Sequence, residues 1–129
     1  MNYFGKLSMT RRSQLDPRLQ AVADEAIKVC NFAITCGHRG YADQEAACRA
    51  GTSHLHFPNS LHNRKPSLAM DCAPYPVDWK NIPRFEEMAK VILAAAERLG
   101  IPLEWGGNWP KFKDYPHFQL IEGKGEDNG

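Results

Sequence analysis

The sequence lacks the features that place a chain in a membrane or on nucleic acid. No run of apolar residues approaches the roughly 20 needed to cross a bilayer. The first six residues lack the apolar core of a signal peptide, so we expect a protein made in the cytosol without membrane insertion. The formal net charge is only +1. Phosphate recognition normally needs a larger basic surplus, which argues against nucleic-acid binding.

Several signatures of catalysis and metal binding are also missing. There is no Gly-rich phosphate loop, no G-x-S-x-G element and no H-E-x-x-H motif. The cysteines form no C-x-x-C pair and no zinc-ribbon spacing. We expect them to be small, buried apolar residues in a reducing compartment, with disulfides formed after release as the alternative. They are Cys30, Cys36, Cys48 and Cys72.

The chain has the size and composition of one globular domain. Its 129 residues suffice for a single core, and they contain no internal repeat, low-complexity tract or linker. We expect the domain to span residues 1–122. Residues 123–129, rich in glycine and charge, are expected to form a flexible tail.

Helix signals are clear in two places. Asp16 is a candidate N-cap with Pro17 at the first helical position, and apolar residues then recur at three- and four-residue steps. A second strong pattern runs from about Pro83 to Leu99 and stops at Gly100. The full set of expected elements is helices at 16–30, 42–49 and 83–99, and strands at 32–36, 68–72, 102–105 and 117–121.

This order of elements predicts an α+β fold with a small antiparallel sheet flanked by helices. Residues 52–67 contain several Pro and Asn residues and should form a long loop that carries His62. The same loop holds His54 and His56, a weaker candidate for metal binding.

Three residues far apart in the chain, His62, Asp71 and His117, have the chemistry of a zinc site. Two imidazoles and one carboxylate leave the fourth position of tetrahedral zinc open for water, as catalytic zinc requires. Zinc can lower the pKa of that water from about 15.7 to about 7. Side chains alternate along a strand, so Asp71 and His117 can both point away from the core into a cleft.

Each residue also has an ordinary structural interpretation. His62 alone would be a surface or capping residue, and His117 a core histidine with its hydrogen bonds satisfied. Asp71 is harder to dismiss, because burying an unpaired carboxylate is costly. Asp114 would be a turn residue, although three residues before His117 it can also reach an attacking water as a general base.

The segments that carry these residues resemble the motifs of a known family. Ser60-Leu-His62 with Ala69-Met-Asp71 resembles S-x-H…A-x-D, and Asp114-Tyr-Pro-His117 resembles (D/E)-x-x-H. These are motifs of the zinc peptidases that include the VanX and VanY D-Ala-D-Ala peptidases and phage endolysins with L-alanyl-D-glutamate peptidase activity. Further similarity lies in residues 37–44, which resemble G-x-R…Q, and residues 105–109, which resemble W-G-G-D-W.

The resemblance implies a fold and a set of roles. The fold would be that of the hedgehog and D,D-peptidase group, with His62, Asp71 and His117 as ligands of one catalytic Zn²⁺. Asp114 would deprotonate the attacking water, and Arg39 would stabilise the oxyanion. Residues expected to orient the ligands or the substrate are Gln44, Ser60, Asn63, Trp109 and Tyr115.

Three features of the sequence depart from the family pattern. Asp71 stands nine residues after His62, whereas the shorter family motif has Asp seven residues after His. Asn108 replaces the Asp of W-G-G-D-W, and Gln119 stands where the vancomycin-resistance enzymes often have Glu. None of the replaced residues is an expected ligand, so the departures concern substrate preference and packing rather than hydrolysis.

The function implied by the resemblance is zinc-dependent hydrolysis of the peptidoglycan stem peptide. We expect an L-alanyl-D-glutamate endopeptidase acting as a phage endolysin, a monomer released from the host cytoplasm through a holin-type pore. A D-alanyl-D-alanine carboxypeptidase or dipeptidase is the alternative. A non-catalytic, zinc-stabilised binding module is a second alternative from another class of function.

Overall fold

The computed structural model describes residues 2–121, so the expected tail at 123–129 lies outside the described residues. Its helices are α1 (Lys6–Arg12), α2 (Pro17–Ile27), α3 (Tyr41–Arg49) and α4 (Ile82–Leu99), with short 3-10 helices η1 (Leu61–Asn63) and η2 (Gly106–Asn108). The strands are β1 (Phe32–Cys36), β2 (Ala69–Pro74), β3 (Leu103–Trp105) and β4 (His117–Leu120). This confirms the predicted α+β fold with a small antiparallel sheet. Between residues 2 and 121, no helix is both long and apolar enough to span a bilayer.

The two strongest helix predictions are confirmed in detail. The Asp16 side chain accepts a hydrogen bond from the backbone of Arg18 at the start of α2, and Pro17 opens the helix. Helix α4 begins after Asn81, close to the expected start, and ends at Gly100, whose left-handed backbone (φ 71°) suits glycine. Both helices bury their apolar faces in one core.

Helix α1 was not predicted, because it has no apolar periodicity to detect. Leu7 and Met9 are exposed, whereas Ser8 is buried. The Ser8 hydroxyl accepts a hydrogen bond from the backbone N–H of Ile34, and Arg11 donates to the Ile34 carbonyl. Polar contacts thus hold α1 against β1. Because β1 is an edge strand, its outer backbone groups have no neighbouring strand to bond with.

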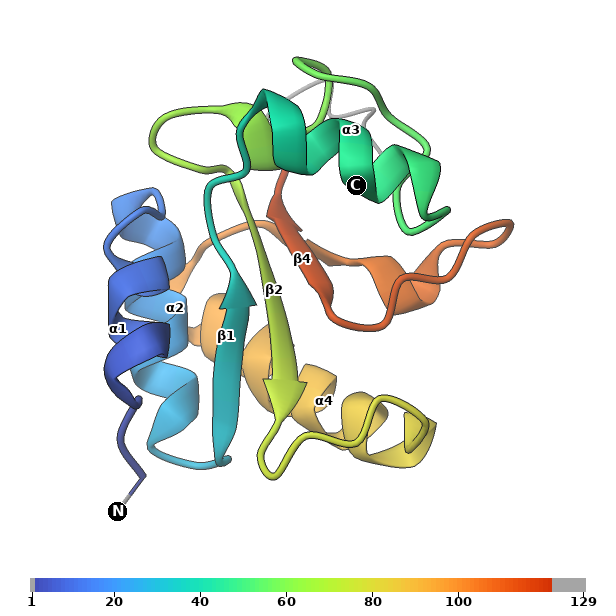
Figure 1. The fold of residues 1–129 in the computed structure, drawn as a ribbon. Helices are drawn as coiled ribbons and strands as arrows, with labels where there is room; N and C mark the ends of the chain where they lie inside the picture. The colour runs from blue at the N-terminus through green and yellow to red at the C-terminus, as the bar shows by residue number, and fades with distance from the viewer. Residues whose placement is uncertain (1, 122–129) are drawn as a thin grey trace.

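The sheet has the strand order β1-β2-β4-β3, with all neighbours antiparallel. Helices α1 and α2 lie beside β1, α4 lies behind the sheet, and α3 lies across one end (Figure 1). Met70 of β2 and Phe118 of β4 pair with each other and belong to the core. Their neighbours Asp71 and His117 also pair and point to the opposite face, away from α4.

Candidate metal centre and active site

Strand pairing in the sheet brings the central residues of the candidate site together. Asp71 on β2 pairs directly with His117 on β4, and also with Cys36 at the end of β1, just after a register shift in that strand. Opposite residues on antiparallel strands lie within about 4.5–5.5 Å of each other. Residues separated by 35 and 46 positions in sequence are therefore neighbours on one face of the sheet.

His62 reaches this face from η1 rather than from a strand. Ser60 is the N-cap of η1, and its hydroxyl accepts a hydrogen bond from the backbone N–H of His62. The Asn63 side chain returns a hydrogen bond to the backbone of Ser60, which completes a capping box. The expected long loop thus contains one ordered turn, and this turn buries the His62 side chain completely.

The three predicted ligand atoms form a nearly equilateral triangle. His62 Nε2 lies 3.2 Å from Asp71 Oδ1 and 3.3 Å from His117 Nδ1, and His117 Nδ1 lies 3.3 Å from Asp71 Oδ1. A tetrahedral cation bound at about 2.0–2.1 Å separates neighbouring ligands by about 3.3–3.4 Å. The triangle therefore has the dimensions of one face of a zinc coordination shell.

In each imidazole, the nitrogen that points away from the triangle makes a hydrogen bond, and this bond determines which of the two nitrogens can bind a metal. His62 Nδ1 lies 2.8 Å from the Gly37 carbonyl oxygen, and His117 Nε2 lies 2.7 Å from Gln119 Oε1. Both oxygens accept hydrogen bonds, so each of these nitrogens carries the proton. In the neutral imidazoles that bind a metal, the lone pairs of His62 Nε2 and His117 Nδ1 are then directed at Asp71, which is the orientation that metal ligands need.

Electrostatics at the triangle favour a positive charge. Burial lowers the pKa of His62, but the charge and hydrogen bond of Asp71 outweigh burial and raise that pKa to about 10. Burial opposes ionisation of Asp71 in turn, yet the two histidines hold the pKa of Asp71 below its usual range. Three acceptor atoms this close together repel one another unless a proton or a cation neutralises them. The residues present therefore fit a divalent cation.

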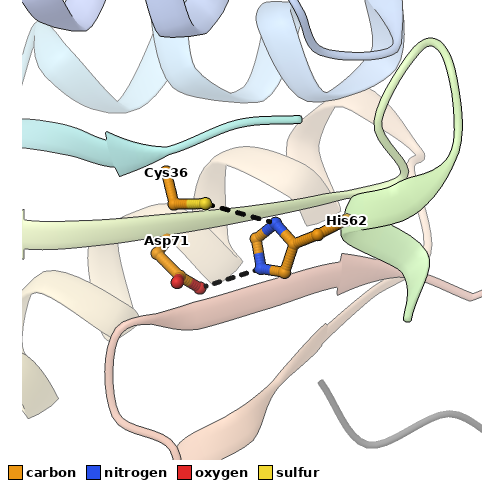
Figure 2. Close-up of side chains that lie close together, drawn as sticks. All are labelled: Cys36, His62 and Asp71. Carbon is orange, nitrogen blue, oxygen red and sulfur yellow. Dashed lines mark hydrogen bonds and ion pairs between the residues drawn. The ribbon is translucent and has the colours of Figure 1, made fainter. Parts of the chain in front are cut away.

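Cys36 is a further potential metal ligand, which sequence reasoning missed. Its sulfur and one ligand atom each from His62 and Asp71 lie within 4.8 Å of one another. Figure 2 shows Cys36 and Asp71 beside different nitrogens of the His62 ring. The Cys36 Sγ lies 3.8 Å from Nδ1, the nitrogen already bonded to Gly37, so Cys36 is less well placed than His117.

The expectation of four buried cysteines is wrong for three of them. All four thiols are free, but full burial is reached by Cys72 alone, and the other three are partly exposed. Cys36 could have been singled out by its place at the end of a strand, one residue before the Gly37 of the family motif.

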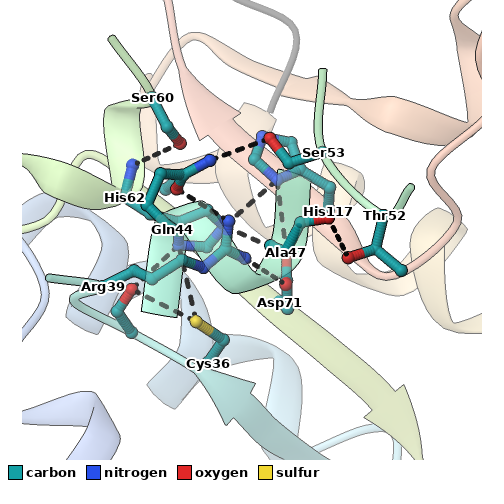
Figure 3. Close-up of polar contacts among 12 residues, drawn as sticks. Cys36, Arg39, Gln44, Ala47, Thr52, Ser53, Ser60, His62, Asp71 and His117 are labelled. Carbon is teal, nitrogen blue, oxygen red and sulfur yellow. Dashed lines mark hydrogen bonds and ion pairs between the residues drawn. The ribbon is translucent and has the colours of Figure 1, made fainter. Parts of the chain in front are cut away.

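Arg39 lies beside the triangle and is held from two sides. It donates to Gln44 Oε1 at 2.9 Å and approaches Asp71 Oδ2 at 3.5 Å. Its backbone N–H also donates to the His62 carbonyl at 2.8 Å. Figure 3 shows this network of polar contacts around Arg39, Gln44 and His62.

Gln44, Ser60 and Asn63 support the site from behind and do not line the cavity described below. Gln44 is fully buried and uses its amide to hold the Ser53 hydroxyl and the Leu55 carbonyl, while its oxygen accepts from Arg39. Asn63 donates to the Arg39 carbonyl. Their contacts position the η1 turn and the Arg39 guanidinium.

Asp114 lies in the loop before β4 and faces the same site. Its backbone N–H donates to the Gly106 carbonyl, and its carbonyl accepts from the His117 N–H. A Cβ at Gly106 would collide with the Asp114 carbonyl oxygen, so glycine permits this close approach of two loops. Burial, and then the charge of Asp71, raise the pKa of Asp114 to about 6, although His117, His62 and Arg39 act against this rise.

A cavity of about 500 Å³ opens onto this arrangement. Its walls include Asp71, Asp114 and Arg39, together with Lys113 and Tyr115. This volume lies within the range of small-molecule sites, about 300–1,000 Å³. The cavity therefore brings a candidate base and a guanidinium to one edge of the triangle.

The aromatic residues near the site occupy different positions. Trp109 is buried, with its ring 5.2 Å from that of His117, and its indole N–H donates to Glu104. Tyr115 lines the cavity. Trp105 stacks on Phe118 and belongs to the core.

The weaker histidine candidates have other partners. His56 bonds to Glu45 and lies beside Cys48, whereas the His54 ring packs on Phe112. Within the described residues, the group of potential metal ligands contains neither histidine.

Gln119 offers a test of how His117 is oriented. Replacing it by leucine removes the acceptor for His117 Nε2 and should weaken the affinity of the site for a divalent cation about 10–100-fold, as loss of such partners typically does. Gln119→Glu keeps an acceptor and should retain affinity. Competition with a chromogenic chelator measures both variants. Equal affinity of wild type and Gln119→Leu would contradict this role.

Comparison with known proteins identifies the family of the chain. The family model of the phage L-alanyl-D-glutamate peptidase matches residues 1–124. The L-alanyl-D-glutamate peptidase of Escherichia phage T5 is 33% identical over 125 residues, covering 93% of this chain and 90% of its own. The peptidoglycan L-alanyl-D-glutamate endopeptidase CwlK of Bacillus subtilis (strain 168) is 30% identical over 129 residues, covering 84% and 75%.

A solved structure extends this similarity to three dimensions. The crystal structure of Serratia marcescens L-Ala D-Glu endopeptidase ChiX superimposes with a TM-score of 0.79 at 30% identity, covering 93% of this chain and 91% of that one. Sequence and fold thus agree over nearly the whole length. The chain belongs to the phage L-alanyl-D-glutamate peptidase family.

Proposed function

We propose that this peptidoglycan endopeptidase hydrolyses the bond between L-alanine and D-glutamate in the stem peptide, using one zinc ion. His62 Nε2, Asp71 Oδ1 and His117 Nδ1 would hold the ion. The observation that carries the proposal is their triangle of 3.2–3.3 Å, with both imidazoles oriented from behind. Membership of the family supports the choice of bond.

Proton transfer and stabilisation of the oxyanion are assigned to residues of the chain itself. When bound, zinc supplies a Lewis acid that activates water and polarises a carbonyl. Asp114 takes the proton of the attacking water and delivers it to the leaving amine, for which its raised pKa is suited. Arg39 presents a permanent positive charge to the oxyanion from the cavity wall.

The activity should fall on the acid side as Asp114 becomes protonated. The carboxylate is the active form, so kcat/KM rises with pH and levels off above the pKa of Asp114. That pKa is about 6 without a metal, and a bound dication would lower it, so the acid limb should lie at or below pH 6. Rates on a soluble stem peptide between about pH 4 and 8 test this. A rate that keeps rising well above pH 6 would contradict the assignment.

Digestion of purified sacculi tests the bond itself. The expected product is a new free N-terminus on D-glutamate, identified by mass spectrometry. Released D-alanine would overturn the proposal in favour of D-Ala-D-Ala peptidase activity. Metal analysis of the same protein should find one zinc per chain.

The phage members of the family support a proposal for where the protein acts. We propose that the protein acts as an endolysin, made in the host cytoplasm as a monomer and released to the wall through a holin-type pore. Expression in a host with and without a co-expressed holin tests this release, since lysis should require both proteins. Lysis without the holin would reject this part of the proposal.

A further inference from the structure

Trp79 is an exposed aromatic side chain that the chemistry above does not use. It lies in residues 75–81, the connection between β2 and α4, and 57% of it is exposed. A single exposed apolar side chain is common on a protein surface, so exposure alone does not indicate a function. The surroundings of this ring are what suggest one.

The ring is held in a fixed orientation. Trp79 stacks on the buried Phe85 of α4, with ring centroids 5.8 Å apart and an interplanar angle of 25°. Phe85 belongs to the core, so the ring is supported from behind by a rigid element. A flat surface oriented in advance loses little entropy when it binds a ligand.

Trp79 also lines the candidate active-site cavity. The same cavity contacts Asp71, Asp114 and Arg39. Figure 1 shows residues 75–81 at the end of the sheet opposite α3, and the segment from β1 into α3, to which Arg39 belongs, leads to the other end. The cavity wall thus takes a cation from the segment before α3 and a neutral aromatic ring from the segment before α4.

We propose that Trp79 forms a saccharide subsite that binds the N-acetylmuramyl ring to which the stem peptide is attached. This inference rests on the proposed function, because that substrate fixes what lies on each side of the scissile bond. On the amino side, a single alanine of about 3.3–3.6 Å separates the bond from the lactyl group of the sugar. A sugar ring must therefore lie close to the site during cleavage.

Charge complementarity assigns the two sides of the substrate. The glutamyl side carries carboxylates, which the positive charge of Arg39 attracts toward its part of the cavity wall. The N-acetylmuramyl ring presents a face of C–H groups, which packs well on a flat indole. The neutral Trp79 ring therefore matches the sugar better than the acidic peptide.

The experiment compares two substrates that differ only in the sugar. One is a stem peptide carrying N-acetylmuramic acid on its alanine, and the other is the same peptide with an N-acetyl group. Wild type should prefer the muramyl peptide in kcat/KM. Trp79→Ala should lower kcat/KM on the muramyl peptide about three- to tenfold, the range of one aromatic stacking contact, and leave the N-acetyl peptide unchanged. Trp79→Phe should keep most of the preference.

Tyr75→Ala is the matched control. Tyr75 is 58% exposed on the same connection but lines other cavities, so its loss should not affect the preference. An equal fall on both peptides in Trp79→Ala, or no preference in wild type, would overturn the subsite while leaving the proposed function intact. If wild type cleaved neither peptide, the proposed function would fail and the subsite with it.

Discussion

His117→Ala should abolish both zinc binding and hydrolysis. The substitution removes one corner of a triangle whose sides are 3.2–3.3 Å and leaves two members of the proposed ligand set, His62 and Asp71. Two ligands do not complete the three-ligand set of a catalytic zinc site. We expect less than one-tenth of a zinc per chain and a loss of at least about 10³-fold in kcat/KM, since the metal supplies several kcal/mol of transition-state stabilisation.

Thermal unfolding separates metal loss from misfolding. A bound ion stabilises the folded state by mass action, so a chelator should lower the Tm of the wild type. The Tm of His117→Ala should not respond to the chelator, while its circular dichroism spectrum should remain native. His38→Ala is the matched control, because His38 lines a different cavity and should retain zinc and activity.

Cys36 supplies the competing interpretation of the same site. If Cys36 rather than His117 completes the ligand set with His62 and Asp71, then Cys36→Ser would lose zinc and His117→Ala would keep it. We expect the reverse, because the Cys36 sulfur faces the nitrogen of His62 that is bonded to Gly37. Full zinc occupancy in His117→Ala would reject the proposed ligand set.

The second large effect is expected from Asp114. Asp114→Ala should keep the zinc and the fold while kcat falls at least about 10²-fold, the lower range of general-base contributions. The loop should keep its shape because its hydrogen bonds to Gly106 and His117 use the backbone of residue 114. Asp114→Asn, which preserves the shape of the side chain, should show the same loss.

Asp43→Asn controls for the loss of one negative charge, since Asp43 is exposed on α3 and lies outside the cavity walls. Unchanged turnover in Asp114→Ala would reject the role of base. A zinc-stabilised binding module has no use for a base, so a wild-type protein that binds sacculi without cutting them would favour that alternative.

Sequence alone was enough to predict elements built from local patterns. The three-and-four spacing in α2 and α4, their caps at Asp16 and Gly100, and the alternation in β2 and β4 all depend on neighbours within a few residues. Sequence motifs also led to the family. Helix α1 escaped prediction because Ser8 and Arg11, which hold it, act through hydrogen bonds to the distant Ile34.

The geometry of the site was decided by the tertiary structure. Strand register places Asp71 opposite His117, and the capped η1 turn carries His62 to both of them across a loop longer than the family's shorter motif. The free nitrogen of each imidazole depends on Gly37 and Gln119, and the cavity that joins Asp114 to Trp79 depends on the packing of separate loops. Sequence specifies which chemical groups are present, but distances between groups far apart in the chain exist only once the sheet has paired and the core has packed.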